Sequence, residues 1–281
     1  MTNDDDARRL EAEAALIDGC NKVYRYLQAK GGYLEQRGWA PQPGSRAEGH
    51  TGIEALYLKH AGTYLSSSED HLMATIELVK SGIRSSALQT LLRTSVEASA
   101  RGYWLLENIP DTQRACRGAT EQLEYLLAEQ KLGPPQKTAI DTLCAEAVAL
   151  GLHEKHSHPR GSGGKAKKGA LLGWGDGPRK ATDLVVSVFP KVGPHDVTAG
   201  AYFYALLSAS THGRSDLGAY HYRPLGSPDK SGGVVAELSL DAELLTELLK
   251  IGVVAHRYAW LRWVDDNGLG RETWLQIDPA F

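Results

Sequence analysis

The stretch LLRTSVEASARGYW, residues 91–104, combines an apolar helical pattern with three regularly spaced charges. Arg93, Glu97 and Arg101 are each four residues apart, and no other charge occurs from Ser85 to Leu106. At about 100° per residue, this spacing puts all three side chains in one narrow sector of a helix. We call this sector the charged stripe, and its environment is the main question that the sequence raises.

The charged stripe has two interpretations. In the first it is a solvated helix face with two i,i+4 ion pairs, each worth about 0.3–0.5 kcal/mol. In the second it points inward, and two arginines against one glutamate leave a net positive charge for an anionic group. Its neighbours Ala100 and Trp104 favour the second, because an exposed face more often carries Lys, Glu or Gln. Beside the stripe, Ser95, Ser99 and Gly102 are small enough to let another helix approach closely.

A second helix, predicted over 195–212, helps to decide between the two interpretations of the charged stripe. Its core, VTAGAYFYALLSASTHG, carries no charged residue, so we expect it to be covered on most sides. Tyr204, Ser208 and His212 nevertheless share one sector at four-residue spacing. Buried hydroxyls and imidazoles without hydrogen-bond partners cost about 1–3 kcal/mol each. The charged stripe can supply those partners, so we predict that the two helices face each other.

This pairing predicts one polar cavity. Arg93 and Arg101 would hold an anionic small molecule, with Tyr204 and Ser208 as further binding residues. His212 would be the catalytic acid or base, and Glu97 would orient the arginines. The alternative is a structural network of the same residues with no ligand. We predict no metal and no cofactor at this site.

The rest of the chain has helical periodicity, which predicts an all-α fold of about eight helices. Asp241 has the residue type and position of an N-cap for the last long helix. We read SSSED at 66–70 as a similar cap that separates two helices. The predicted helices cover residues 4–30, 53–65, 66–80, 85–108, 111–131, 135–151, 179–189, 195–212 and 242–266, with one short strand within 222–240.

Residues 153–178 change character abruptly, because glycine and lysine replace the apolar period. We predict a long mobile loop there, inside a single domain over 1–281. Its HEKHSH stretch, 153–158, has several imidazoles but not the zincin H-E-x-x-H spacing, and we expect a solvated loop rather than a metal site. GSGGKAKKG, 161–169, lacks the GK[ST] of a phosphate-binding loop and follows no strand.

Composition narrows the class of protein. The 281 residues carry a net charge of −3, which does not suggest a protein that coats nucleic acid. Three cysteines without a C-x-x-C pattern are typical of a reducing compartment. No run of about 18 uncharged apolar residues occurs, and the N-terminus is acidic, so we expect a cytoplasmic protein without a membrane span. The sequence leaves open whether the protein forms a homo-oligomer.

We assign His256, in the last long helix, to the core, where we expect it to be a hydrogen-bonded residue.

Two resemblances add to these predictions. Two stretches of the chain together resemble a broad group of uncharacterised helical proteins from actinobacteria. They are DHLMATIELVKSGIRSSALQTLLRTSVEASARGYWLLE, 70–107, and YALLSASTHG, 204–213. That group implies no reaction, but it supports the pairing of the two segments. Arg214 and His221 also fit the R-x6-H spacing of HEPN ribonucleases, in which arginine and histidine from two subunits form the RNA-cleaving site, although Gly218 interrupts the helix that this motif requires.

The sequence thus supports three hypotheses of function. The first is a bacterial protein that binds or processes an anionic small molecule at the charged stripe. The second is a HEPN-like ribonuclease of a defence or toxin system, acting on RNA through Arg214 and His221. The third is a non-catalytic interaction protein in which the polar residues are structural.

Overall fold

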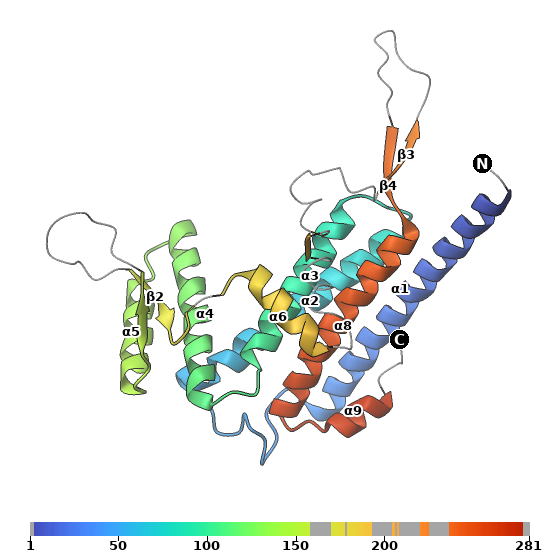
Figure 1. The fold of residues 1–281 in the computed structure, drawn as a ribbon. Helices are drawn as coiled ribbons and strands as arrows, with labels where there is room; N and C mark the ends of the chain where they lie inside the picture. Colours follow the sequence, from blue (N-terminus) through green and yellow to red (C-terminus); the bar gives the residue numbers. More distant parts are fainter. Residues whose placement is uncertain are drawn as a thin grey trace, which may run out of the picture.

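The chain folds into an all-α structure, as predicted (Figure 1). The computed structural model describes residues 3–157, 170–177, 179–192, 204–205, 207, 220–224 and 236–277. Within these ranges it contains eight α-helices and two small antiparallel sheets of two strands each. In the described part of the chain, none of the helices is both long enough and apolar enough to cross a membrane.

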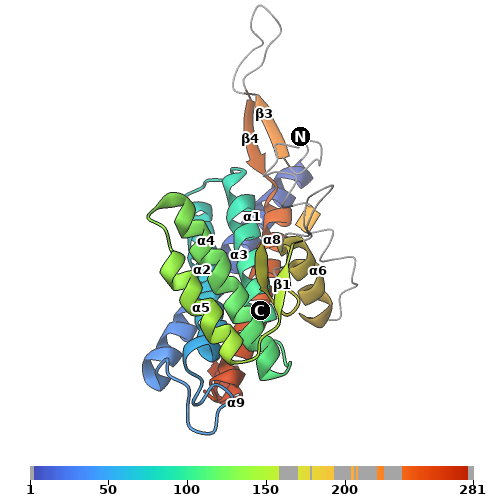
Figure 2. The same cartoon turned by 90° about the vertical axis from the view of Figure 1, so that its left-hand side faces the viewer.

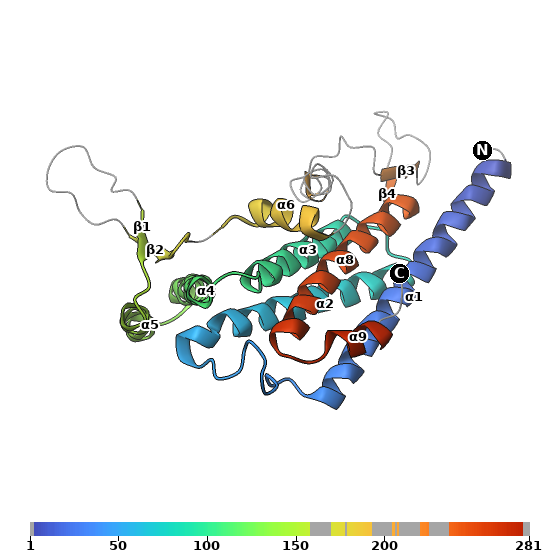
Figure 3. The same cartoon turned by 60° about the horizontal axis from the view of Figure 1, so that its bottom comes forward.

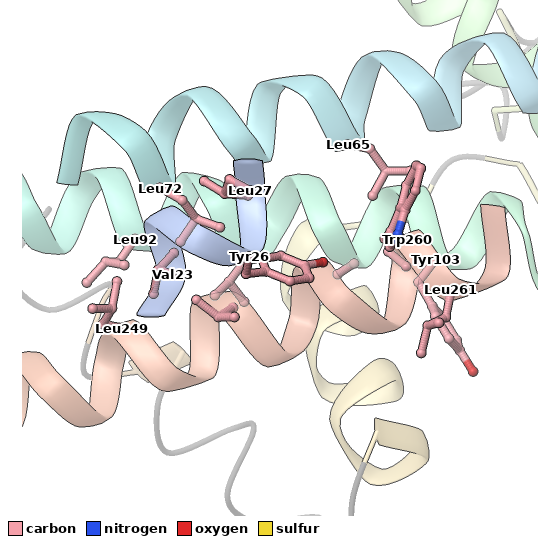
Figure 4. Packing of buried hydrophobic residues seen from close by; sticks show 14 of the residues in the cluster. Val23, Tyr26, Leu27, Leu65, Leu72, Leu92, Tyr103, Leu249, Trp260 and Leu261 are labelled. Atoms are coloured by element: carbon pink, nitrogen blue, oxygen red, sulfur yellow. The ribbon is translucent and has the colours of Figure 1, made fainter. Parts of the chain in front are cut away.

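The main core lies between four long helices. They are α1 (Asn3–Arg37), α2 (Leu56–Lys80), α3 (Ala87–Leu105) and α8 (Ala242–Asp266). Helix α3 packs against both α2 and α8, and α1 packs against α2 and α8 (Figure 3). Leucine and aromatic side chains from all four helices interdigitate between them (Figure 4). Helix α6 (Ala181–Val192) lies along α3 and adds Leu184, Val185 and Val188 to this core.

Helix α2 is continuous, so the prediction of two helices separated by SSSED was wrong. Ser68 is fully buried, and its Oγ lies 2.8 Å from the Oγ atoms of both Ser95 and Ser99 on α3. These serines face a neighbouring helix and do not cap a helix end. The small residues of α3 do allow a close approach, as predicted, and the helix that approaches is α2.

Outside the main core, the chain forms a smaller hydrophobic cluster around the two helices that lie nearest the viewer in Figure 2. Helices α4 (Asp111–Leu132) and α5 (Lys137–Ala149) form it together with the 3-10 helix η1 (Gly52–Ala55). Trp174 from a short β-hairpin completes it. This hairpin pairs β1 (Glu154–His156) with β2 (Leu171–Trp174), so both ends of the predicted loop 153–178 are ordered strands. The single domain over 1–281 stays a prediction.

Gly118 sets how closely the smaller cluster approaches the main core. A Cβ on Gly118 of α4 would lie 2.4 Å from the amide nitrogen of Tyr57. The main chains of α4 and the start of α2 are therefore in direct contact, which only glycine allows at this position.

The C-terminal part agrees well with the sequence prediction. Asp241 caps α8, and its Oδ1 accepts a hydrogen bond of 3.0 Å from the amide of Leu244. Before it, β3 (Tyr220–Pro224) and β4 (Ala236–Leu240) form a hairpin where one strand was predicted. Helix α9 (Arg271–Ile277), which the sequence analysis missed, places Trp274 in the main core.

His256 lies in the main core, as predicted, but without the predicted hydrogen bonds. Its side chain is fully buried, and neither ring nitrogen has a hydrogen-bond partner among the residues that the structure describes. The ring of Tyr26 packs edge-on against it at 5.8 Å. Burial lowers the pKa of His256 well below its usual range, and the positive charge of Lys30 lowers it further.

We expect the stability of the protein to fall below pH 6.5 because of His256. In the folded state the ring stays neutral, whereas in the unfolded chain it takes up a proton near its ordinary pKa of about 6.5. The stability is therefore unaffected above that pH and is lost as the pH falls below it, by about 1.4 kcal/mol per pH unit. Urea unfolding at pH 7.5, 6 and 5 measures this loss. In His256→Leu, the unfolding free energy should fall with decreasing pH less steeply than in the wild type, by that amount per pH unit. An identical pH dependence of the two proteins would contradict the prediction.

Candidate functional site

The three side chains of the charged stripe are partly buried on α3. Arg93, Glu97 and Arg101 expose 19%, 25% and 24% of their side-chain surface. Trp104 in the same sector is almost fully buried. The stripe is thus covered by other parts of the fold and is not an open helix face.

Arg93, Glu97 and Tyr204 form a triangle of hydrogen bonds. Arg93 Nε donates to Glu97 Oε1 at 2.7 Å, and Tyr204 Oη donates to the same oxygen at 2.8 Å. Arg93 Nη2 in turn donates to Tyr204 Oη at 3.2 Å, while its guanidinium lies over the tyrosine ring at 5.3 Å. The Tyr204 side chain therefore contacts α3, as the sequence predicted for this residue. Ser208 and His212, four and eight residues further along the sequence, lie outside the described residues.

Arg101 belongs to a different cluster, which corrects the predicted pairing with Glu97. Its Nη1 donates to both carboxylate oxygens of Glu121 on α4, at 3.1 and 3.2 Å, and lies 3.7 Å from Glu124. Tyr64 of α2 also donates its hydroxyl to Glu121, whose side chain is only 3% exposed. The reason is geometric: α4 brings a buried carboxylate to Arg101, whereas Glu97 is already held by Arg93 and Tyr204.

These contacts change the charge balance of the stripe. Two guanidinium groups now face three carboxylates, those of Glu97, Glu121 and Glu124. The net positive charge that predicted an anion site is therefore absent among these groups. Burial, and then the charge of Glu121, raise the pKa of Glu124 and the pKa of Tyr64. The raised pKa keeps the Tyr64 hydroxyl protonated, as its role as a hydrogen-bond donor requires.

Sequence reasoning missed the residues of α4 that complete this network. Arg114, Arg117, Glu121 and Glu124 are spaced by three, four and three residues, so they lie on one side of α4. Arg114 and Arg117 are also buried; Arg117 pairs with Glu107 at 2.9 Å and lies 4.7 Å from the ring centre of Trp104. This repeated spacing was visible in the sequence, and it predicts a second charged stripe opposite the first.

The other candidate residues are only partly covered by the described structure. His221 lies on strand β3, whereas the HEPN motif requires a helix, and Arg214 lies outside the described residues. In the HEKHSH stretch, Glu154 and His156 lie on β1, and His158 is outside the described part. Among the residues that the structure describes, no group of three or more His, Cys, Asp or Glu side chains could hold a metal ion.

Two hollows lie elsewhere on the described surface. One, of ≈ 350 Å³, lies between η1, the start of α4 and the end of α5. The other is an open apolar groove of ≈ 670 Å³ between the end of α2 and the start of α3. Arg93, Glu97 and Arg101 line neither hollow.

No protein-family model, curated protein or solved structure matches the chain. The resemblance to actinobacterial helical proteins therefore stays a prediction.

Proposed function

We propose that the protein is a non-catalytic helical interaction protein, in which the charged stripe is a structural network. The observation that supports this best is that each charge of the stripe has a partner of opposite charge within the fold. Glu97 Oε1 already accepts two hydrogen bonds, so this oxygen is engaged as an acceptor and is not free to act as a base.

In this proposal the network joins elements that are distant in sequence. Arg93 and Glu97 hold Tyr204 against α3, and Arg101 holds α4 through Glu121. Tyr64 adds α2 to the second cluster. Because polar groups pair only in one alignment, such bonds select one arrangement of the helices among several that would bury similar apolar area.

A structural role predicts unequal costs for the two arginines of the stripe. Arg101→Met leaves the carboxylate of Glu121 buried with only the Tyr64 hydroxyl, so we expect a loss of about 2 kcal/mol in unfolding free energy. Arg93→Met leaves Glu97, which is 25% exposed and keeps Tyr204, so we expect a loss of under about 1 kcal/mol. Urea unfolding of both variants measures the difference, and equal losses would argue against the proposal.

An anion site at Arg93 is the second candidate. It is favoured by one observation: within the described residues, Arg93 uses Nε and Nη2 but not Nη1. Thermal unfolding in succinate and in chloride at equal ionic strength separates the two candidates. The structural proposal predicts equal midpoints. A midpoint raised by succinate in the wild type, and not in Arg93→Met, would favour the anion site instead.

A further inference from the structure

The ≈ 350 Å³ pocket at the start of α4 has the size of a small-molecule site. It lies in the smaller cluster and shares no lining residue with the charged stripe. Its chemistry is therefore independent of the proposed function.

One wall of the pocket is apolar. Ala115 of α4 and Leu152, which follows α5, are buried members of the smaller cluster. Leu150 also lines the pocket and is 41% exposed. Covering this apolar surface with a ligand would be favourable, because it would remove the surface from water. This wall can bury the hydrocarbon part of a ligand of a few carbon atoms.

The rest of the pocket's rim is polar and includes two carboxylates, those of Glu54 and Asp111. Asp111 is paired with Arg46 at 3.0 Å, so its charge is compensated. Glu54 on η1 also lines the pocket, and the structure shows no ion pair for it among the described residues. One uncompensated carboxylate thus borders an apolar wall.

His50 adds an oriented hydrogen-bonding group to this rim. Its Nδ1 lies 3.3 Å from the hydroxyl of Tyr57, and the two rings pack edge-on at 5.9 Å. Tyr57 is itself buried, so the imidazole is held in place. Nε2 is then the ring nitrogen that is left for a ligand.

We propose that this pocket binds a small protonated amine with a short aliphatic body. The ammonium group would pair with Glu54, and the aliphatic body would lie on Leu150, Leu152 and Ala115. The N-terminus of α4 also borders the pocket and favours anions, but its dipole is equivalent to only about half an elementary charge, which the full negative charge of Glu54 exceeds. Glu54 therefore decides that the preferred ligand carries a positive charge.

Three probes of nearly equal shape test the proposal: isopentylamine, isopentyl alcohol and 4-methylpentanoate. Each is titrated into the full-length protein and followed by amide NMR shifts. We expect the amine to bind in the millimolar range, as is usual for ligands of this size. The shifts should centre on residues 50–54, 111–115 and 150–152. The alcohol should bind more weakly, and the carboxylate should not bind there.

Three variants identify the residues responsible. Glu54→Gln should weaken amine binding about ten-fold, because it removes the charge-assisted contact. Glu35→Gln on α1 changes the net charge equally and should leave binding unchanged. Leu150→Trp should abolish binding by filling the pocket, at an exposed position where the fold tolerates the change. The proposal is overturned by no amine binding, by equal binding of the carboxylate, or by binding that survives Glu54→Gln or Leu150→Trp undiminished.

Discussion

Replacing Gly118 by alanine is expected to lower the free energy of unfolding by about 3 kcal/mol or more. The new Cβ would lie 2.4 Å from the amide nitrogen of Tyr57 and 2.9 Å from the carbonyl carbon of Leu56. Both are main-chain atoms, so no side-chain rotation can relieve the contact. Helix α4 would have to move away from α2, which would open the smaller cluster.

Gly102→Ala is the matched control. Gly102 is also buried inside a helix, but its Cβ would lie 3.6 Å from the carbonyl oxygen of Ala61, which is an ordinary contact. Alanine favours the helix by about 1 kcal/mol, so this variant should be as stable as the wild type or slightly more stable. Urea unfolding of both variants makes the comparison. If the two had similar stability, α4 would not be in close contact with α2.

Asp266→Ala should be the most damaging change to a charged residue, at about 3–5 kcal/mol. Arg114 of α4 donates to Asp266 at the end of α8, and both side chains are buried. Burial raises the pKa of Asp266 although Arg114 lowers it, so removal from water outweighs the attraction between the two charges. The alanine variant would leave Arg114 buried, with the main-chain carbonyls of Leu106 and Glu107 as its remaining hydrogen-bond acceptors in the described part of the chain.

The double variant Arg114→Met, Asp266→Leu separates the cost of leaving Arg114 as a buried, unpaired charge from the cost of lost packing. It removes both buried charges, so it should recover most of the stability that Asp266→Ala loses. Asp18→Ala, which breaks the exposed pair between Asp18 and Lys22, should change little. Thermal unfolding measures all three variants. A loss in the double variant as large as in the single one would mean that packing, and not the orphaned charge, is responsible.

The sequence predicted most helices because their apolar periodicity is local. Asp241 is the clearest case, since an N-cap and its acceptor bond involve residues only three apart. The SSSED prediction failed for the opposite reason. Whether Ser68 caps a helix or meets another serine depends on α3, which lies about 30 residues further on.

The candidate site was predicted in part. The contact of Tyr204 with Arg93 and Glu97 followed from a charge-free helix that needs polar partners. The partner of Arg101 did not follow from the sequence. The i,i+4 spacing suggested Glu97 as the partner of Arg101, whereas the structure brings the buried Glu121 of α4 to it. His256 shows the same limit, since its core position was predictable from the sequence, whereas its lack of a hydrogen-bond partner among the described residues was not.

The division of the structure into two hydrophobic clusters has a spectroscopic consequence. Trp174 is buried in the smaller cluster, whereas Trp104, Trp260, Trp263 and Trp274 are buried in the main core, and Trp39 is 60% exposed. The difference in fluorescence between the wild type and Trp174→Phe therefore reports on the α4–α5 region alone. Followed through a denaturant series, that difference signal reveals whether the two clusters melt together or one before the other.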